Sequence, residues 1–272
     1  MFLIDSISWN VAFSFVGFDS VMPLLVSQLT DSSPVIGLIG TIHAAGWTLP
    51  QLAIGHWINK KSRKKPYLMA GLSGRVMFIA VPLALWLGLT RRPIAMLALF
   101  FTMLAIHALI DSLATVSLFD IMSRSIDTRQ GSRLFGAVQV ISGLLGIGVG
   151  GLVTRILESP GLPFPKNYAL LFAAGGLSIL PSTIALGLVK EPPAEETERE
   201  GLPFKVSGWL DLLAGDVRFQ RLILCQILVT MMQLASPFFA VHAAEALSLP
   251  ESIIGSFVIA LAGAGLLASL IL

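Results

Sequence analysis

Charge is scarce in this chain. Asp, Glu, Lys and Arg make up only 12% of its 272 residues, whereas a soluble domain carries roughly 25%. Apolar residues make up 55%, and the mean hydropathy is +0.83. The formal net charge of +2 gives no basic footprint for nucleic acid. The composition therefore predicts an integral membrane protein that lies in a lipid bilayer and binds no nucleic acid.

Cysteine and catalytic motifs are almost as rare. The one cysteine, Cys225, lies in an apolar run, which excludes an internal disulfide framework and is typical of a packing residue. The sequence has no phosphate-binding loop, no HExxH pair and no Cys and His spacing suited to a metal. No Lys or Arg precedes the first apolar run, so that run is predicted to be retained as a span. We predict no enzymatic activity, no metal and no cofactor.

Long apolar runs are what the chain has in place of charge. A bilayer crossing needs roughly 20 apolar residues, and continuous runs select helices over a barrel. The predicted fold class is all-α, a polytopic membrane bundle with about eight transmembrane helices. The predicted spans are residues 7–27, 35–58, 67–90, 94–119, 134–157, 167–189, 219–247 and 252–272.

The Lys and Arg residues gather in alternate loops. Residues 59–66, 120–133 and 190–221 together hold 13 of the 18. The opposite loops hold four, two of which are Arg91 and Arg92. Because cytoplasmic loops retain cations, the split predicts a multi-pass plasma-membrane protein with a cytoplasmic N-terminus, although Arg91 and Arg92 run against the trend.

One long polar break divides the chain. Residues 190–218 begin with the acidic run KEPPAEETEREG and continue into the amphipathic stretch SGWLDLLAGD. This pattern predicts a cytoplasmic linker with a short interfacial helix. The predicted domains are thus a six-helix bundle over 1–189, the linker over 190–218, and two further helices over 219–272.

The loop GHWINKKSRKK, from Gly55 to Lys65, resembles the loop between the second and third helices of the major facilitator superfamily, whose pattern is G-x-x-x-D-R-x-G-R-[RK]. Gly55, Lys60, Arg63 and Lys64 take its glycine and basic positions, while Asn59 and Ser62 replace its acid and its second glycine. The resemblance implies a conformational gate at this loop. Without the acid, that gate would be weaker than in the family or would rely on the surrounding cations.

Two further segments carry the resemblance. RQGSRLFG is similar to the family's R-G-x-x-x-G element at the entry to the fifth helix, with candidate residues Arg129, Gly131, Arg133 and Gly136. GFDSVMP, residues 17–23, resembles its first-helix pattern of a glycine followed by a late proline. The family fold has two six-helix halves that load a central cavity from alternate sides. The chain ends inside the eighth apolar run, which predicts a fragment or a truncated chain with four helices of the second half missing.

Ionisable groups inside a span cost roughly 2.5–3.5 kcal/mol each, so they mark candidate sites. Asp19 is expected on the helical face of Ser8, Ala12, Phe15 and Pro23, either as a proton or cation site or as an acid bonded to a neighbouring helix.

His107, Asp111 and Thr115 follow one another at one-turn spacing, so they are predicted to share a helix face. A carboxyl and an imidazole in that position form a candidate pair for proton coupling. The alternative is an internally satisfied pair that closes a helix contact.

Gln139, Gln226 and Gln233 are candidates for hydrogen bonds to a solute, or for bonds that only join helices, and His43 and Arg75 are weaker candidates. The glycine-rich run SGLLGIGVGG, residues 142–151, partly matches an element of the family's antiporters. Small residues at four-residue spacing also let two helices approach closely, and that interpretation needs no antiport.

The predicted function is secondary active transport of a small solute by alternating access, coupled to protons, with efflux by antiport as one form. The alternative is a non-transporting remnant of the same fold that acts as a receptor or scaffold. Movement of lipid by this fold is a third reading.

Overall fold

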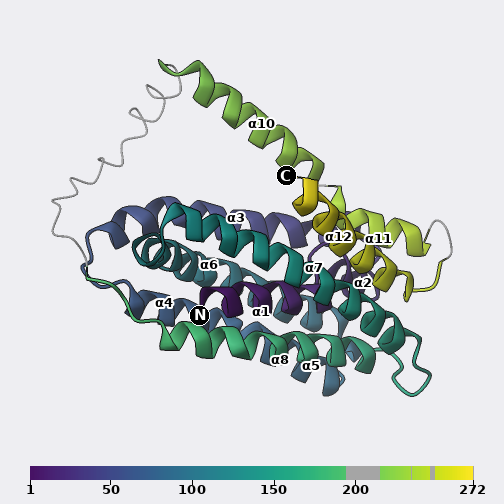
Figure 1. Cartoon of the computed structure of the whole chain (residues 1–272). Coiled ribbons are helices and arrows are strands. Elements are labelled where there is room, and N and C mark those ends of the chain that lie inside the picture. The colour runs from purple at the N-terminus through teal and green to yellow at the C-terminus, as the bar shows by residue number, and fades with distance from the viewer. Residues whose placement is uncertain (194–214, 234, 246–248, 272) are drawn as a thin grey trace.

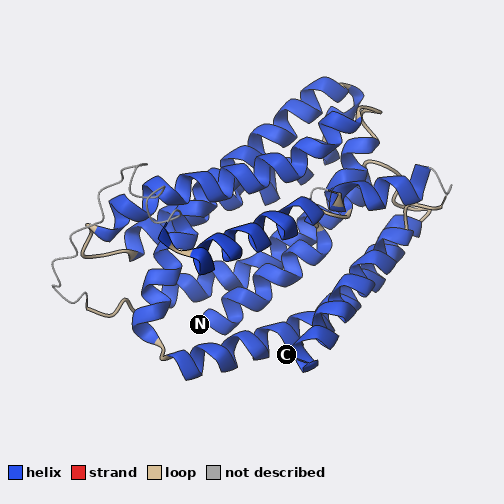
Figure 2. Cartoon of the chain, turned by 90° about the horizontal axis from the view of Figure 1, so that it is seen from above, coloured by secondary structure: helices blue, strands red, loops and turns tan. Residues whose placement is uncertain are grey.

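The computed structural model describes residues 1–193, 215–233, 235–245 and 249–271. Within these residues the chain is helical and has no strand (Figure 2). The all-α prediction is therefore confirmed. The predicted interfacial helix of the linker, SGWLDLLAGD, lies outside the described residues except for its last two positions, 215 and 216.

The helices follow one another along the chain as α1 (Phe2–Phe15), α2 (Val21–Ser27), α3 (Ser33–Asn59), α4 (Lys65–Gly71), the 3₁₀ turn η1 (Leu72–Val76), α5 (Met77–Trp86), the 3₁₀ turn η2 (Leu89–Arg91), α6 (Pro93–Ser125), α7 (Thr128–Glu158), α8 (Lys166–Leu188), α10 (Val217–Gln233), α11 (Ser236–Glu245) and α12 (Ile253–Ile271).

Four helical stretches are long and apolar enough to cross a membrane. They are Lys65–Trp86, which runs through α4, η1 and α5, and the helices α6, α7 and α8. These coincide with the spans predicted at 67–90, 94–119, 134–157 and 167–189. The other four predicted spans stay predictions: α3 is long but less apolar, α10 and α11 divide residues 219–247, and α1 and α12 are shorter apolar helices.

The first predicted span is not one helix. It breaks between Phe15 and Val21, where the N–H groups of Ser20 and Met22 both bond to the carbonyl of Gly17. Pro23 lies in the first turn of α2, where its missing N–H costs nothing. In a helix that continued from α1 it would remove a backbone hydrogen bond and kink the helix. Asp19 therefore sits in the connecting turn and is exposed, and the helical face predicted for it is wrong.

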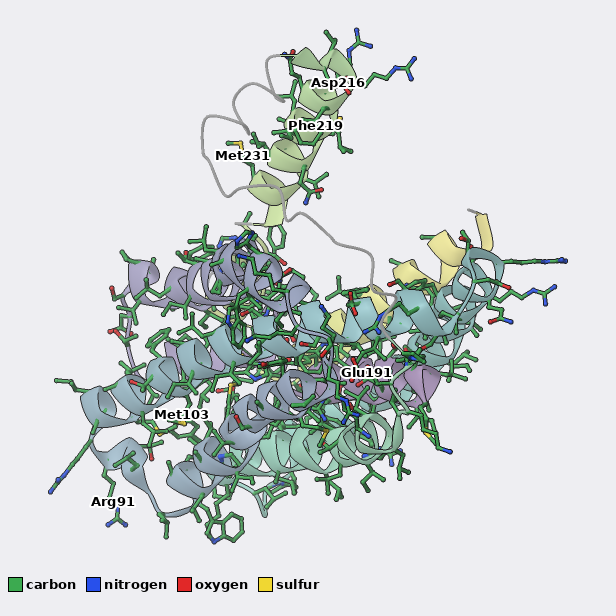
Figure 3. All side chains as sticks on the ribbon, turned by 90° about the vertical axis from the view of Figure 1, so that its left-hand side faces the viewer. Arg91, Met103, Glu191, Asp216, Phe219 and Met231 are labelled. Atoms are coloured by element: carbon green, nitrogen blue, oxygen red, sulfur yellow. The ribbon has the colours of Figure 1, made fainter. Side chains whose placement is uncertain are left out.

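Helix α1 lies near the middle of the bundle and packs against α7 and α8, and α3 packs against α6 (Figure 1). The main apolar core draws on α1, α2, α3, α5, α6, α7, α8, α11 and α12 and includes Phe100, Tyr168 and Phe172, each at most 1% exposed. Helix α10 extends away from this bundle, with Phe219 and Met231 on it (Figure 3). Cys225 on α10 is exposed, so its interpretation as a packing residue is wrong.

Glycines bring α7 and α12 together. A Cβ on Gly146 would lie 2.9 Å from Cβ of Ala262, and one on Gly150 would lie 2.7 Å from the carbonyl oxygen of Gly255. A Cβ on Gly148 or Gly151, on other faces of α7, would meet nothing within 4 Å. The run 142–151 thus lets two backbones approach closely, as the simpler of its two interpretations predicts. We call this contact the glycine seam.

Candidate functional site

A cavity of about 490 Å³ lies among α1, α3, η1, α6 and α7. Its polar lining includes Asp5, His43, Arg75, Asp111 and Gln139. Its aromatic lining consists of Trp9, Phe18, Trp47, Phe119 and Phe135. Ionisable groups within apolar helices are rare and mark candidate pathways for ions or solutes. We call this space the central cavity.

Asp111 on α6 is the acid that faces the central cavity without an ion pair among the described residues. Its Oδ2 accepts a long hydrogen bond, 3.5 Å, from Oγ1 of Thr115 one turn later. Thr115 Oγ1 in turn accepts from the indole Nε1 of Trp47 on α3 at 3.2 Å. The carboxylate thus keeps free acceptor positions toward the cavity, where a proton or a cationic group could bind.

Arg75 holds the opposite charge. It lies in η1, and its Nη2 is 3.8 Å from Oδ1 of Asp5 on α1 and donates to Oγ of Ser182 on α8 at 2.8 Å. Nη1 donates to Oγ1 of Thr183, and Ser182 donates to Asp5. The side chains of Arg75 and Asp5 are each only 10% exposed, so removing either partner would leave the other buried and unpaired. This network ties three helices together beside the cavity.

The two histidines of the region differ in exposure to the cavity. His43 lines it, and its ring stacks on that of Phe18 with centroids 3.7 Å apart. His107 is 1% exposed and does not line the cavity; its Nδ1 lies 3.2 Å from the carbonyl oxygen of Gly74, an obligatory acceptor. His107 and Asp111 therefore bond to different partners, and no bond joins them as the predicted proton-sharing pair would need.

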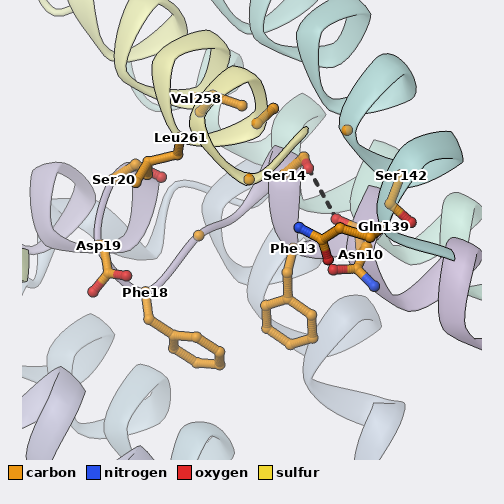
Figure 4. A pocket seen from close by; sticks show the side chains of 14 residues that line it. Asn10, Phe13, Ser14, Phe18, Asp19, Ser20, Gln139, Ser142, Val258 and Leu261 are labelled. Carbon is orange, nitrogen blue, oxygen red and sulfur yellow. Dashed lines mark hydrogen bonds between the residues drawn. The ribbon is translucent and has the colours of Figure 1, made fainter. Parts of the chain in front are cut away.

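A second, smaller pocket of about 280 Å³ lies between the α1–α2 break, α7 and α12 (Figure 4). It shares Asn10, Phe18 and Gln139 with the central cavity. Asp19 lines it on the side away from Gln139 and Ser142. Asp19 and Asp111 thus belong to neighbouring spaces that meet at three shared side chains.

The remaining candidates lie elsewhere. Gln226 is exposed on α10, and the side chain of Gln233 lies outside the described residues. Arg129 and Arg133 are exposed on the first turns of α7, and a Cβ on Gly131 or Gly136 would meet nothing within 4 Å. The part of the chain that the structure describes contains no group of three His, Cys, Asp or Glu side chains that could hold a metal.

The predicted gate loop has one buried cation and two exposed ones. Lys60 and Arg63 are exposed, and Gly55 has open space beside it. Lys64 is 3% exposed, and its Nζ donates to the carbonyl oxygen of Ile58 at the end of α3. The side chain of Asn59 is outside the described residues. Lys64 therefore caps α3 rather than facing water.

Glu191 joins this loop to the ends of two other helices. Its Oε1 accepts from the backbone N–H of Lys64 at 2.6 Å, and its Oε2 accepts from that of Lys65 at 3.1 Å. Arg124, in the last turn of α6, donates to the same carboxylate at 3.2 Å. We call Glu191, Lys64, Lys65 and Arg124 the Glu191 clasp. It shows that three of the cation-rich segments assigned to one side by their charge meet at one end of the bundle.

The Glu191 clasp predicts a pH dependence of stability. Burial alone would raise the pKa of Glu191, but the N–H groups of Lys64 and Lys65 and the Arg124 guanidinium outweigh it and hold the pKa below its ordinary value of 4.5. The stabilisation is therefore complete above the ordinary value and is lost as pH falls through the lower, folded-state pKa. We expect Glu191→Gln to lower the unfolding temperature by roughly 3 °C at neutral pH and to narrow this difference in acid.

The measurement is thermal unfolding of the purified protein over a pH series. Glu158→Gln, which alters an exposed acid at the other end of the bundle, is the matched control. The role of the ionised carboxylate would be contradicted if the unfolding temperatures of the wild type and Glu191→Gln differed by the same amount from neutral pH into acid.

Sequence reasoning missed Asp5 and Glu191 and ranked Arg75 low. Asp5 precedes the start predicted for the first span, and Glu191 lies in an acidic run typical of a solvated linker. The signal available in the sequence was Arg75 itself: it lies in an apolar run with no acid nearby in the chain, so its partner had to come from another helix.

No protein family, curated protein or solved structure matches this chain.

Proposed function

We propose that this chain belongs to a secondary active transporter of the major facilitator type, which moves a small solute through the central cavity in exchange for, or together with, protons. The observation that carries the proposal is the placement of Asp111. An acid without an ion pair, at the wall of a cavity between apolar helices, is the group that proton coupling requires.

The lining also favours one class of solute. Arg75 is occupied by Asp5, Ser182 and Thr183, which leaves Asp111 as the charge open to the cavity. Five aromatic residues line the same cavity, and the negative faces of their rings would stabilise a cation. The expected solute is small and positively charged, with an apolar body.

Reconstitution tests the proposal. The full chain is placed in vesicles that contain a pH indicator, a pH gradient is imposed, and pools of small organic cations are added. We expect at least one pool to dissipate the gradient faster than in protein-free vesicles, and to raise the unfolding temperature of the chain through binding. Binding of cations without movement of protons would favour the receptor alternative. Absence of both binding and proton movement would overturn the proposal.

A further inference from the structure

A second large concavity lies on the outside of the bundle. It encloses about 790 Å³ between η1 and α5 on one side and α8 on the other. We call it the α5–α8 groove. Its rim consists of Ile79, Leu83, Trp86, Leu177 and Leu180, each at least 50% exposed.

The groove has a fixed floor. A Cβ on Gly176 would lie 3.0 Å from the carbonyl oxygen of Phe78, so the backbones of α8 and α5 touch there. The two stretches that flank the groove, Lys65–Trp86 and Lys166–Leu188, are both among those able to cross a membrane. Exposed apolar side chains at this depth face hydrocarbon rather than water.

The dimensions suit an acyl chain. The groove runs from Leu72 to Trp86, and at about 1.5 Å per residue this corresponds to about 21 Å. One leaflet of the hydrocarbon core is about 15 Å thick, half of the whole. A chain that enters at one end can therefore lie in the groove along its full length.

Three cations lie beside or shortly after Trp86, which forms one end of the groove. Nζ of Lys166 lies 5.8 Å from the centroid of the Trp86 ring. Arg91 and Arg92 follow Trp86 on the 3₁₀ turn that begins after Gly88, whose φ of 77° reverses the chain. All three are exposed, and within the described ranges none forms an ion pair (Figure 3 shows Arg91 extending from the edge of the molecule).

We propose that the α5–α8 groove binds an anionic phospholipid, with an acyl chain along the groove and the phosphate among Arg91, Arg92 and Lys166. The charge of the headgroup complements the three cations, and the indole of Trp86 lies at the interface between chain and headgroup, where such rings are favoured. The proposal also gives Arg91 and Arg92 a purpose on the side of the protein that otherwise has few cations. It requires that the helices cross a membrane and does not depend on transport.

Quenching of Trp86 by brominated lipid tests the site. The full chain is reconstituted in phosphatidylcholine vesicles with increasing brominated phosphatidylglycerol or brominated phosphatidylcholine, and the signal of Trp86→Phe is subtracted. Each cation near an anionic headgroup contributes roughly a fivefold gain, so three of them give roughly a hundredfold, and we expect half-quenching at about a hundredfold less phosphatidylglycerol than phosphatidylcholine. Equal quenching by the two lipids would overturn the proposal.

Two variants separate the parts of the site. Arg91→Gln with Arg92→Gln leaves Lys166 and should reduce the lipid preference to about fivefold. Arg218→Gln with Arg221→Gln removes the same charge from exposed positions on α10 and should leave the preference unchanged. Ala173→Phe places a ring in the groove and should weaken quenching by both lipids.

Other results would overturn it. An undiminished lipid preference in the double arginine variant would show that these cations do not bind the headgroup. Normal quenching in folded Ala173→Phe would show that the acyl chain does not lie in the groove. Circular dichroism and gel filtration check that each variant is folded; the arginine pair lies on the surface, so it tests the site even if Ala173→Phe does not fold. Loss of the preference on adding millimolar glycerol phosphate would show an anion site that does not need the acyl chain.

Discussion

Replacing Asp111 by asparagine is expected to reduce proton-coupled solute movement to the rate of protein-free vesicles while the chain stays folded. An amide has nearly the same shape as the carboxyl and can still accept the hydrogen bond from Thr115. It cannot carry a proton or hold a positive charge. The effect on coupled transport should therefore be complete, and the effect on stability small.

Two other acids serve as comparisons. Asp31→Asn removes a charge from an exposed residue outside the cavity lining and should leave transport unchanged. Asp19→Asn alters the neighbouring pocket and should cause a partial loss. The measurement is solute uptake and pH change in the same vesicles. Full coupled transport in Asp111→Asn, or complete loss of coupled transport in Asp19→Asn alone, would contradict the prediction. Either result would indicate that the coupling group lies at the break between α1 and α2 and not in the central cavity.

Gly150→Leu is expected to separate α12 from α7 and to destabilise the fold by about 3 kcal/mol, or roughly 10 °C in unfolding temperature. A Cβ at this position would lie 2.6 Å from Cγ1 of Ile259 and 2.7 Å from the carbonyl oxygen of Gly255. A side chain can change its rotamer, but the Gly255 backbone cannot withdraw without moving the helix. For that reason Ile259→Ala should not rescue the variant.

The adjacent residue is the matched control. A Cβ on Gly151 meets nothing within 4 Å, so Gly151→Leu should keep the wild-type stability or raise it slightly, since leucine favours a helix more than glycine does. Thermal unfolding in detergent compares the two variants directly. A similar fall in unfolding temperature in both variants would show that the glycine seam does not hold α12 in place.

Much of the bundle follows from the sequence, because uninterrupted apolar runs alone determine where a long helix can lie. The four stretches that can cross a membrane start and end within several residues of the predicted spans. The break in the first span also had its signals, a glycine at 17 and a proline at 23. The span was predicted from the number of apolar residues in a run. Such a count gives no weight to the glycine or the proline, so a continuous helix was predicted.

The site was harder to predict because it depends on contacts between helices. His107 and Asp111 are one turn apart, yet His107 bonds to a carbonyl of η1 while Asp111 faces the cavity. The pairing of Asp5 with Arg75 joins residues 70 positions apart in the chain, which no local pattern records. Asp111 was a candidate from the sequence because an acid in an apolar run is unusual wherever it points, and in the structure it lines the central cavity.

The break after α1 has a consequence for how the chain enters a membrane. Helix α1 has 14 residues and α2 has 7, and neither reaches the roughly 20 that a crossing needs. The turn between them also carries backbone groups that hydrocarbon cannot satisfy. The partners that shield α1 are α7 and α8, and α8 ends only at Leu188. We therefore expect the first segment to reach its final depth late in synthesis, after most of the bundle has been made.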